Sequence, residues 1–273
     1  MELLECILTR NDCYQAKQTI VPKGVMVHST GANNTALARY VQPAEGDADF
    51  DALLTRLGTN HNKNDWNRAG LDVCVHGFIG RLADGSVASV QTLPWDRRGW
   101  HAGTGTGGGS ANDTHISFEI CEDGLTDPDY FGLVYREAVE LTAYLCRQYG
   151  LDPLADGVVI CHSEGYRRGI ASDHADVEHW FPGHGKSMDD FRADTAAALA
   201  PSPEPEKEDD MIWYRTLDEI PEYYRPTMEK LMKTGVLKGY SNPDPDSLED
   251  NVLNVSEDFC RILTLLDQLG KLD

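Results

Sequence analysis

Two stretches of the sequence decide the fold: GVMVHSTGANN at residues 24–34 and GVVICHSEGYRRGIASDHADVEHWFPGH at residues 157–184. Each opens with an apolar run that ends in a histidine, His28 in the first and His162 in the second. Short apolar runs rich in β-branched residues are typical of buried strands. We therefore expect both imidazoles at one edge of a sheet. The polar, Gly-rich segment after His162 is not expected to form an ordinary helix.

Working outward, strands and helices alternate along residues 1–200. The predicted strands, read from β-branched and aromatic runs, are residues 24–30, 71–79, 114–121 and 157–161, with a hairpin over 81–90 turned by Asp84-Gly85. The predicted helices, read from apolar periodicity, are residues 47–57, 133–149 and 187–199. Gly150 is a fitting C-cap for the second helix. This alternation predicts an α/β fold with a mixed central sheet flanked by helices.

Composition excludes several classes of partner. The chain has 273 residues, 41% of them hydrophobic, and a formal net charge of −21. Such an acidic surface argues against binding to nucleic acid and to anionic membranes. No run approaches the roughly 20 apolar residues of a membrane span. The start, MELLECILTRNDC, has no basic segment followed by an apolar core, so we expect no secretion signal and synthesis in the cytoplasm.

The seven cysteines include no CxxC pair, and Cys74, Cys121 and Cys161 lie inside apolar runs. Buried, reduced thiols are the expected state. This too is consistent with a reducing compartment.

Residues 201–210, PSPEPEKEDD, separate two expected domains. Alternating proline and acidic residues can bury little, so this segment predicts an extended linker. Residues 1–200 form the predicted catalytic domain, and residues 211–273 a small helical module. In that module, residues 221–233 and 256–269 are amphipathic, and the second begins with a capping serine, Ser256.

The histidines suggest a zinc hydrolase, because catalytic zinc sites combine three protein ligands with one open position. His28 and His162 supply two candidates at strand ends. The third ligand should come from the following loop, where Asp173 and Asp176 are carboxylate candidates. His174, His179 and His184 offer further nitrogen atoms there. Two imidazoles and one carboxylate leave net positive charge on zinc, which polarises a carbonyl and makes water more acidic.

Four motifs in order carry a family resemblance: PKGVMVHSTG at 22–31, GWHAG at 99–103, SFEI at 117–120, and HSEG at 162–165 followed by SDHADVEHWFP at 172–182. Together they resemble the zinc-dependent N-acetylmuramoyl-L-alanine amidases of the amidase-2 type. That group includes phage endolysins, an autolysin branch and peptidoglycan recognition proteins. The resemblance implies hydrolysis of the amide between N-acetylmuramic acid and L-alanine in peptidoglycan.

The resemblance also implies roles for individual residues. His28 and His162 match the first two zinc ligands. Asp176 matches the third, with Asp173 as the alternative, because the Asp-Pro usual in the family is replaced by Asp176-Val177. The pattern makes Glu119 and His174 catalytic, the first for proton transfer and the second for stabilising the oxyanion.

Three further residues are expected near the substrate. Trp100 and His101 are expected in the substrate cleft, while His76 either lines the cleft or is a buried structural residue. His179 and His184 are expected to support the site from behind or to lie on the surface.

We therefore expect a zinc amidase used for cell lysis, of the phage or prophage endolysin kind from a Gram-positive host, released to the wall after synthesis. The alternatives are a peptidoglycan recognition module that does not cleave, and a cytosolic amidase that recycles muropeptides. The C-terminal module resembles an S-layer-homology-like repeat, although Ser256-Glu257 replace the usual Thr-Arg. Wall anchoring and homo-oligomerisation are both open for it.

Overall fold

The computed structural model describes residues 1–199, 212–237, 253 and 255–272. The chain divides into two units, Met1–Pro201 and Ser202–Asp273, and each is described by itself. The expected linker, residues 201–210, lies outside the described residues. Among the helices of the described part, none has the length and apolar character needed to cross a membrane.

The first unit is built on one mixed sheet. In spatial order its strands are β1 (Leu3–Glu5), β4 (Val87–Gln91), β3 (Gly77–Arg81), β5 (His115–Ile120), β2 (Gly24–Ser29) and β6 (Val159–Cys161). Only the hairpin of β3 and β4 is antiparallel among these described pairs. The predicted mixed α/β fold with flanking helices is confirmed.

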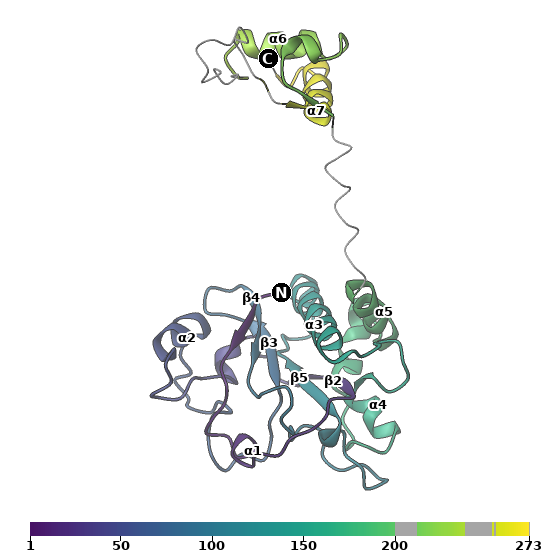
Figure 1. Ribbon diagram of the computed structural model, residues 1–273. Helices are drawn as coiled ribbons and strands as arrows, with labels where there is room; N and C mark the ends of the chain where they lie inside the picture. The colour runs from purple at the N-terminus through teal and green to yellow at the C-terminus, as the bar shows by residue number, and fades with distance from the viewer. Residues whose placement is uncertain (200–211, 238–252, 254, 273) are drawn as a thin grey trace. The chain divides into compact units, whose positions relative to one another are not determined.

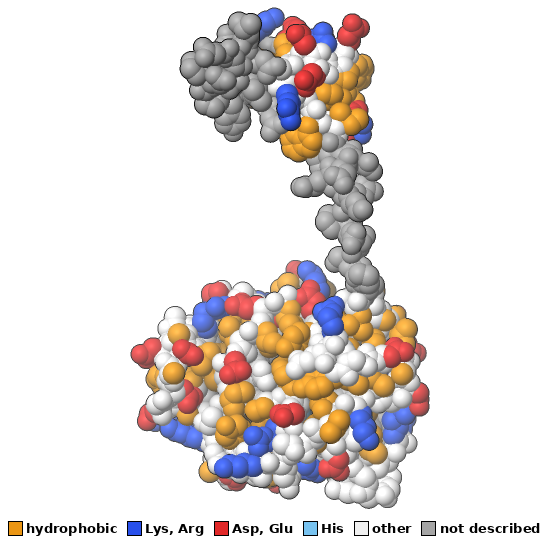
Figure 2. Space-filling view, in the orientation of Figure 1, with side chains coloured by type: hydrophobic (Ala, Val, Ile, Leu, Met, Phe, Trp, Pro, Cys, Tyr) orange, Lys and Arg blue, Asp and Glu red, His pale blue; other side chains and the backbone are white. Residues whose placement is uncertain are grey.

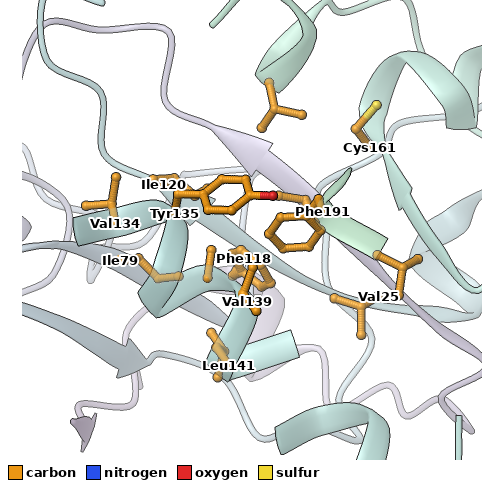
Figure 3. Packing of buried hydrophobic residues seen from close by; sticks show 14 of the residues in the cluster. Val25, Ile79, Phe118, Ile120, Val134, Tyr135, Val139, Leu141, Cys161 and Phe191 are labelled. Atoms are coloured by element: carbon orange, nitrogen blue, oxygen red, sulfur yellow. The ribbon is translucent and has the colours of Figure 1, made fainter. Parts of the chain in front are cut away.

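One face of the sheet packs on two long helices, α3 (Pro128–Tyr149) and α5 (Met188–Leu199), which lie side by side in Figure 1. Alternate residues of the strands, among them Val25, Phe118 and Ile120, point into this core with Tyr135 of α3 and Phe191 of α5 (Figure 3). Strand side chains alternate between faces, so the intervening residues of β2 and β5 point to the opposite side.

Helix α3 shows why its boundaries fall where they do. Asp127 caps its first turn by accepting hydrogen bonds from the amides of Asp129 and Tyr130, and Pro128 occupies the first turn, where no amide hydrogen is needed. The helix ends at Gly150, which adopts a left-handed conformation with φ of 65°. The predicted C-terminus is confirmed, and the helix begins five residues earlier than predicted.

The opposite face of the sheet is covered by short elements and loops. These are α1 (Asp12–Gln15), η1 (Leu37–Arg39), α2 (Phe50–Leu57), η2 (Ala111–Asp113) and α4 (His162–Arg167). Two further turns follow α4, η3 (Asp176–His179) and η4 (Phe181–His184), and their buried side chains belong to the same core as those of α3. Two predictions are corrected here. The strand expected over residues 71–79 begins only at Gly77, because the backbone of Cys74 pairs with Trp100 in an isolated antiparallel bridge. The helix expected from residue 47 begins at Phe50.

The segment after His162 was expected to avoid helix, and that expectation is wrong for residues 162–167, which form α4. Glycine favours this packing instead of preventing it. A Cβ on Gly165 would lie 2.6 Å from Cε of Met26 in β2 and 3.1 Å from Cβ of Ala171, so glycine leaves room for the Met26 side chain between the helix and the strand. The Glu164 carboxylate accepts a hydrogen bond from the Cys161 amide and caps the start of the helix.

The cysteines match their predicted environment. All seven are buried and free.

The second unit is small. It pairs β7 (Trp213–Tyr214) with β8 (Val255–Ser256) and packs η6 (Leu217–Glu219) and α6 (Arg225–Lys233) with α7 (Glu257–Gln268). The hydroxyl of Ser256 accepts a hydrogen bond from the Phe259 amide, as the predicted cap requires. Figure 2 shows hydrophobic surface on this unit. The exposed apolar side chains on α7 and at its C-cap are Phe259, Ile262, Leu265 and Leu269.

We expect a large loss of stability when the Phe118 side chain is removed from the core. Phe118 is fully buried between the sheet and α3. We expect Phe118→Ala to lower the free energy of unfolding by about 3–5 kcal/mol, because it leaves a cavity that the helix cannot fill. Leu154→Ala is the control, since Leu154 is 61% exposed, and it should change stability by less than about 0.5 kcal/mol. Denaturant titration of both variants measures the difference, and equal losses would contradict this packing.

Candidate metal centre

Three neighbouring parallel strands bring the central residues to one level of the sheet. His28 of β2 is the register partner of Glu119 of β5, so the two side chains share a face. On the other side of β2, Val27 is paired with Cys161, which places His162 one residue past the end of β6. Register thus accounts for the proximity of three residues that are far apart in sequence.

Asp176, the first residue of η3, completes a cluster with the two histidines. Its Oδ2 atom lies 3.1 Å from Nδ1 of His28 and 2.9 Å from Nδ1 of His162, and the two Nδ1 atoms are 3.1 Å apart. In the described part of the chain, these are the residues whose ligand atoms gather closely enough to hold a metal ion. Asp173 is exposed and contributes no atom to this cluster.

A chain of hydrogen bonds behind His28 indicates which of its nitrogens carries the proton. Nε2 of His101 lies 3.3 Å from the His115 carbonyl oxygen, which can only accept, so Nε2 is the donor. Burial lowers the pKa of His101 well below its ordinary value, and the neutral ring accepts at Nδ1. Nε2 of His28, 3.0 Å away, must then donate to it. The Nδ1 atom of His28 keeps its lone pair and faces the cluster.

A second series of hydrogen bonds, behind His162, likewise leaves a lone pair on Nδ1 of that ring. The Ser172 hydroxyl donates to the Ala102 carbonyl over 3.2 Å, and its oxygen can then accept from Nε2 of His162 at 3.3 Å. In a neutral His162 ring, the lone pair again lies on Nδ1. Nδ1 of His174 lies 3.2 Å from the same hydroxyl oxygen and can also donate to it.

The donor set fits a zinc ion. Two imidazole lone pairs and one carboxylate oxygen converge with no hydrogen to share, and a cation is what would make such an arrangement favourable. Ligands about 2.0–2.1 Å from a tetrahedral zinc are roughly 3.3 Å apart, close to the 2.9–3.1 Å separations here. His28, His162 and Asp176 are therefore the residues that could hold the metal.

The electrostatics of the ligands favour their metal-binding forms. Burial lowers the pKa of His28, which favours the neutral imidazole. Burial acts to raise the pKa of Asp176, but its interactions with the neighbouring imidazoles of His162 and His28 outweigh it and hold that pKa below its usual range. Asp176 also has a φ of 42°, in the left-handed region that is unusual for a residue other than glycine. Such backbone positions persist only where surrounding contacts hold them.

Glu119 differs from the ligands in being held as a neutral acid. Its Oε2 atom is buried and has no hydrogen-bond partner. Burial, reinforced by the negative charges of Asp176 and Glu122, raises the pKa of Glu119 well above its ordinary value. A carboxyl group with a raised pKa beside a metal cluster is suited to moving protons near neutral pH.

The structure places the other predicted residues as follows. His174 is exposed, with its ring centroid 4.6 Å from that of His162. Trp100 is half-buried and borders a surface pocket of about 310 Å³. That pocket is lined by Asp72, Arg98, Trp100, Gly103, Thr104 and Asn112.

His101 and His76 lie behind the cluster. His101 is bonded to His28, as described above. His76 is fully buried, with Nε2 on the Arg97 carbonyl at 2.7 Å and Nδ1 accepting from the Ser117 amide at 3.0 Å. Burial lowers its pKa to about 4. This geometry matches the second role expected for His76, that of a buried structural residue.

Two residues of the site were missed by sequence reasoning. Ser172 bonds to His162, and Glu122 is 3% exposed, with its Oε1 atom 2.9 Å from Nε2 of His179. Serines and glutamates near glycines carry no local signal of such contacts. His184 stacks on Phe131 with ring centroids 4.2 Å apart and stays away from the cluster.

The chain is similar to known proteins in sequence and in fold. Residues 17–184, more than half of the chain, match the family model described as N-acetylmuramoyl-L-alanine amidase. Among solved structures, the chain is similar to the Staphylococcus aureus hydrolase AmiA in complex with its ligand, with 19% identity, 73% of this chain and 83% of that chain covered, and a TM-score of 0.46. It is also similar to a mutant endolysin from Bacillus subtilis, with 21% identity, coverage of 71% and 99%, and a TM-score of 0.44. At these TM-scores the structural similarities are distant. No curated protein matches the sequence.

The raised pKa of Glu119 predicts a pH effect on stability. A carboxyl group whose pKa is raised by folding stabilises the folded state below its unfolded pKa of 4.5, and this contribution is lost as pH rises through the folded pKa. In metal-free protein we expect wild type to lose stability relative to Glu119→Gln as pH rises above 4.5, until Glu119 is ionised. Thermal unfolding in chelator from pH 4.5 to 9 measures the difference.

Glu178→Gln is the matched control. Arg167 lowers the pKa of Glu178, so the contribution of Glu178 is already complete above pH 4.5. The difference between Glu178→Gln and wild type should therefore stay flat over the same range. A flat difference for Glu119→Gln as well would show that its carboxyl group titrates normally.

Proposed function

Because the chain belongs to the N-acetylmuramoyl-L-alanine amidase family, we propose that it hydrolyses the amide between the lactyl group of N-acetylmuramic acid and L-alanine in peptidoglycan, with zinc as cofactor. The observation that carries the zinc assignment is the convergence of Nδ1 of His28, Nδ1 of His162 and Oδ2 of Asp176 inside the matched region. Both histidines receive their orientation from hydrogen bonds that leave the Nδ1 lone pairs available.

In this proposal His28, His162 and Asp176 hold the ion. When bound, zinc supplies Lewis acidity, which polarises the scissile carbonyl and makes water a better nucleophile at neutral pH. The tuning of the ligands supports this role, because His28 is favoured as a neutral imidazole and Asp176 as a carboxylate.

Glu119 is the proposed proton carrier. As a carboxylate it accepts a proton from the attacking water, and as an acid it returns the proton to the alanine nitrogen as the carbon–nitrogen bond breaks. Its position beside His28 in the sheet and its raised pKa support both halves of this cycle. No covalent intermediate with the enzyme is needed.

His174 is the proposed group that stabilises the oxyanion. Its exposed ring lies beside His162 and is open to substrate. Its Nδ1 atom contacts the Ser172 hydroxyl, and this contact orients the ring. A protonated or hydrogen-bonded imidazole there would favour the negative charge that develops on the carbonyl oxygen. Trp100 and its pocket form the proposed binding surface for the glycan or stem peptide. His101 and His76, expected at the substrate, are instead proposed to support the site from behind.

We extend the proposal to a bacteriolytic role of the endolysin kind. The second unit supports it, because a small module with exposed apolar side chains on α7 suits attachment to the wall or to another copy. An enzyme that recycles soluble muropeptides needs no such module. A recognition module without activity is disfavoured by the presence of Asp176 and Glu119 together.

The test of the reaction is end-group analysis of Gram-positive cell walls digested by the full chain. We expect new N-terminal alanine and no new reducing sugar ends, with the release abolished by a chelator and restored by zinc. Glu119→Gln should retain zinc and lose at least about 100-fold in rate, as expected for loss of a general acid–base group. Wall clearing with no new N-terminal alanine would exclude the amidase reaction.

A paired substitution tests the ligand assignment. Asp176→Ala should lose most of its zinc and its activity, because it removes an oxygen at the centre of the cluster. Asp173→Ala should retain both, because that residue is exposed and outside the cluster. Metal content after dialysis, measured by elemental analysis, gives the answer. The reverse pattern would transfer the ligand role to Asp173.

A further inference from the structure

The ligand Asp176 lies on a short turn, η3, and not on a strand of the sheet. It opens η3 with a left-handed backbone, which other contacts must hold in place. Val177 and Trp180 of the same segment are buried in the core and keep the turn attached to the first unit. Their contacts are with apolar side chains of the core, and Nε1 of Trp180 has no hydrogen-bond partner.

His179, at the other end of η3, adds a polar contact to this apolar packing. Its Nε2 atom lies 2.9 Å from Oε1 of Glu122, three residues beyond Glu119. The same Oε1 atom accepts a hydrogen bond from the Gly31 amide at 3.1 Å, three residues beyond His28. The Glu122 amide in turn donates to the Thr30 hydroxyl at 3.1 Å. One carboxylate therefore joins the turn to the segments that follow β2 and β5.

The same turn carries a second ion pair that provides a contrast. Arg167 of α4 binds Glu178 with two hydrogen bonds of 2.7 and 3.2 Å. The side chains of Arg167 and Glu178 are 56% and 39% exposed, while the Glu122 side chain is only 4% exposed. Exposed pairs contribute little because water screens them, whereas the loss of one partner from a buried carboxylate is costly. The contact of His179 with Glu122 should dominate.

We propose that His179 and Glu122 are positioning residues of the metal centre, which hold η3 so that the Asp176 carboxylate meets the two histidines. The inference rests on the metal site of the proposed function. Neither residue touches the cluster or the substrate in this assignment. The effect is on how well the third ligand is preorganised, and outer contacts of this kind typically change metal affinity by about 10- to 100-fold.

The experiment measures zinc affinity of the full chain by competition with a chromophoric chelator, alongside thermal unfolding of the metal-free protein. We expect His179→Ala to weaken zinc binding at least about tenfold. His179→Gln should restore affinity to within about threefold of wild type, because its amide can still donate to Glu122. Arg167→Ala, the matched control on the same turn, should stay within about twofold.

The outcomes separate this inference from the proposed function. If wild type and Asp176→Ala bind zinc equally poorly, the metal site itself is wrong. If wild type binds zinc tightly and His179→Ala binds it equally well, or if Arg167→Ala weakens binding as much as His179→Ala, the positioning role is wrong. Should His179→Ala not unfold cooperatively, Glu122→Met and Glu122→Gln replace it. The first removes the acceptor for His179 and the second keeps one, so equal affinities would likewise overturn the role.

Discussion

The site depends on three lone pairs that point at one another. Nδ1 of His28, Nδ1 of His162 and Oδ2 of Asp176 lie within 2.9–3.1 Å of each other, and the hydrogen bonds behind the two rings leave no proton between them. The terminal acceptors of those hydrogen bonds are the backbone carbonyls of His115 and Ala102, which cannot change their role. When both rings are neutral, these hydrogen bonds leave the Nδ1 lone pairs facing the cluster, and this is the arrangement that a cation would stabilise.

The sheet and the loops make different contributions to this constraint. Parallel register sets His28 level with Glu119, and the tightly packed face on α3 and α5 keeps the strands rigid. The other face is covered by short turns, and this irregular cover lets Asp176 and Ser172 approach from the side. Close backbone contact contributes to this cover. A Cβ on Gly105 would lie 2.0 Å from the Gly169 carbonyl oxygen, so the loop over residues 103–110 can pack there only with glycine at position 105.

Sequence reasoning succeeded where a residue's role follows from a strand. The apolar runs ending at His28 and His162 predicted both strands, and the alternation of elements predicted the sheet. It failed where a contact joins irregular segments. Nothing local distinguishes Ser172 or Glu122 from surface residues, since their partners are 10 and 57 positions away in the chain. The helix α4 was missed for a related reason, because Gly165 weakens a helix in isolation but here packs closely against Met26 of a strand that is distant in sequence.

The charges around the cluster couple metal binding to the state of Glu119. In the protein alone, burial and the charges of Asp176 and Glu122 favour the protonated form of Glu119. A divalent cation held by Asp176 would offset that negative charge and lower the Glu119 pKa, because an opposite charge nearby favours the ionised form. The base needed to take a proton from water would then form at a lower pH with the metal bound than without it. By linkage, a proton released from Glu119 accompanies metal binding, so zinc affinity should rise with pH over the range in which that group titrates.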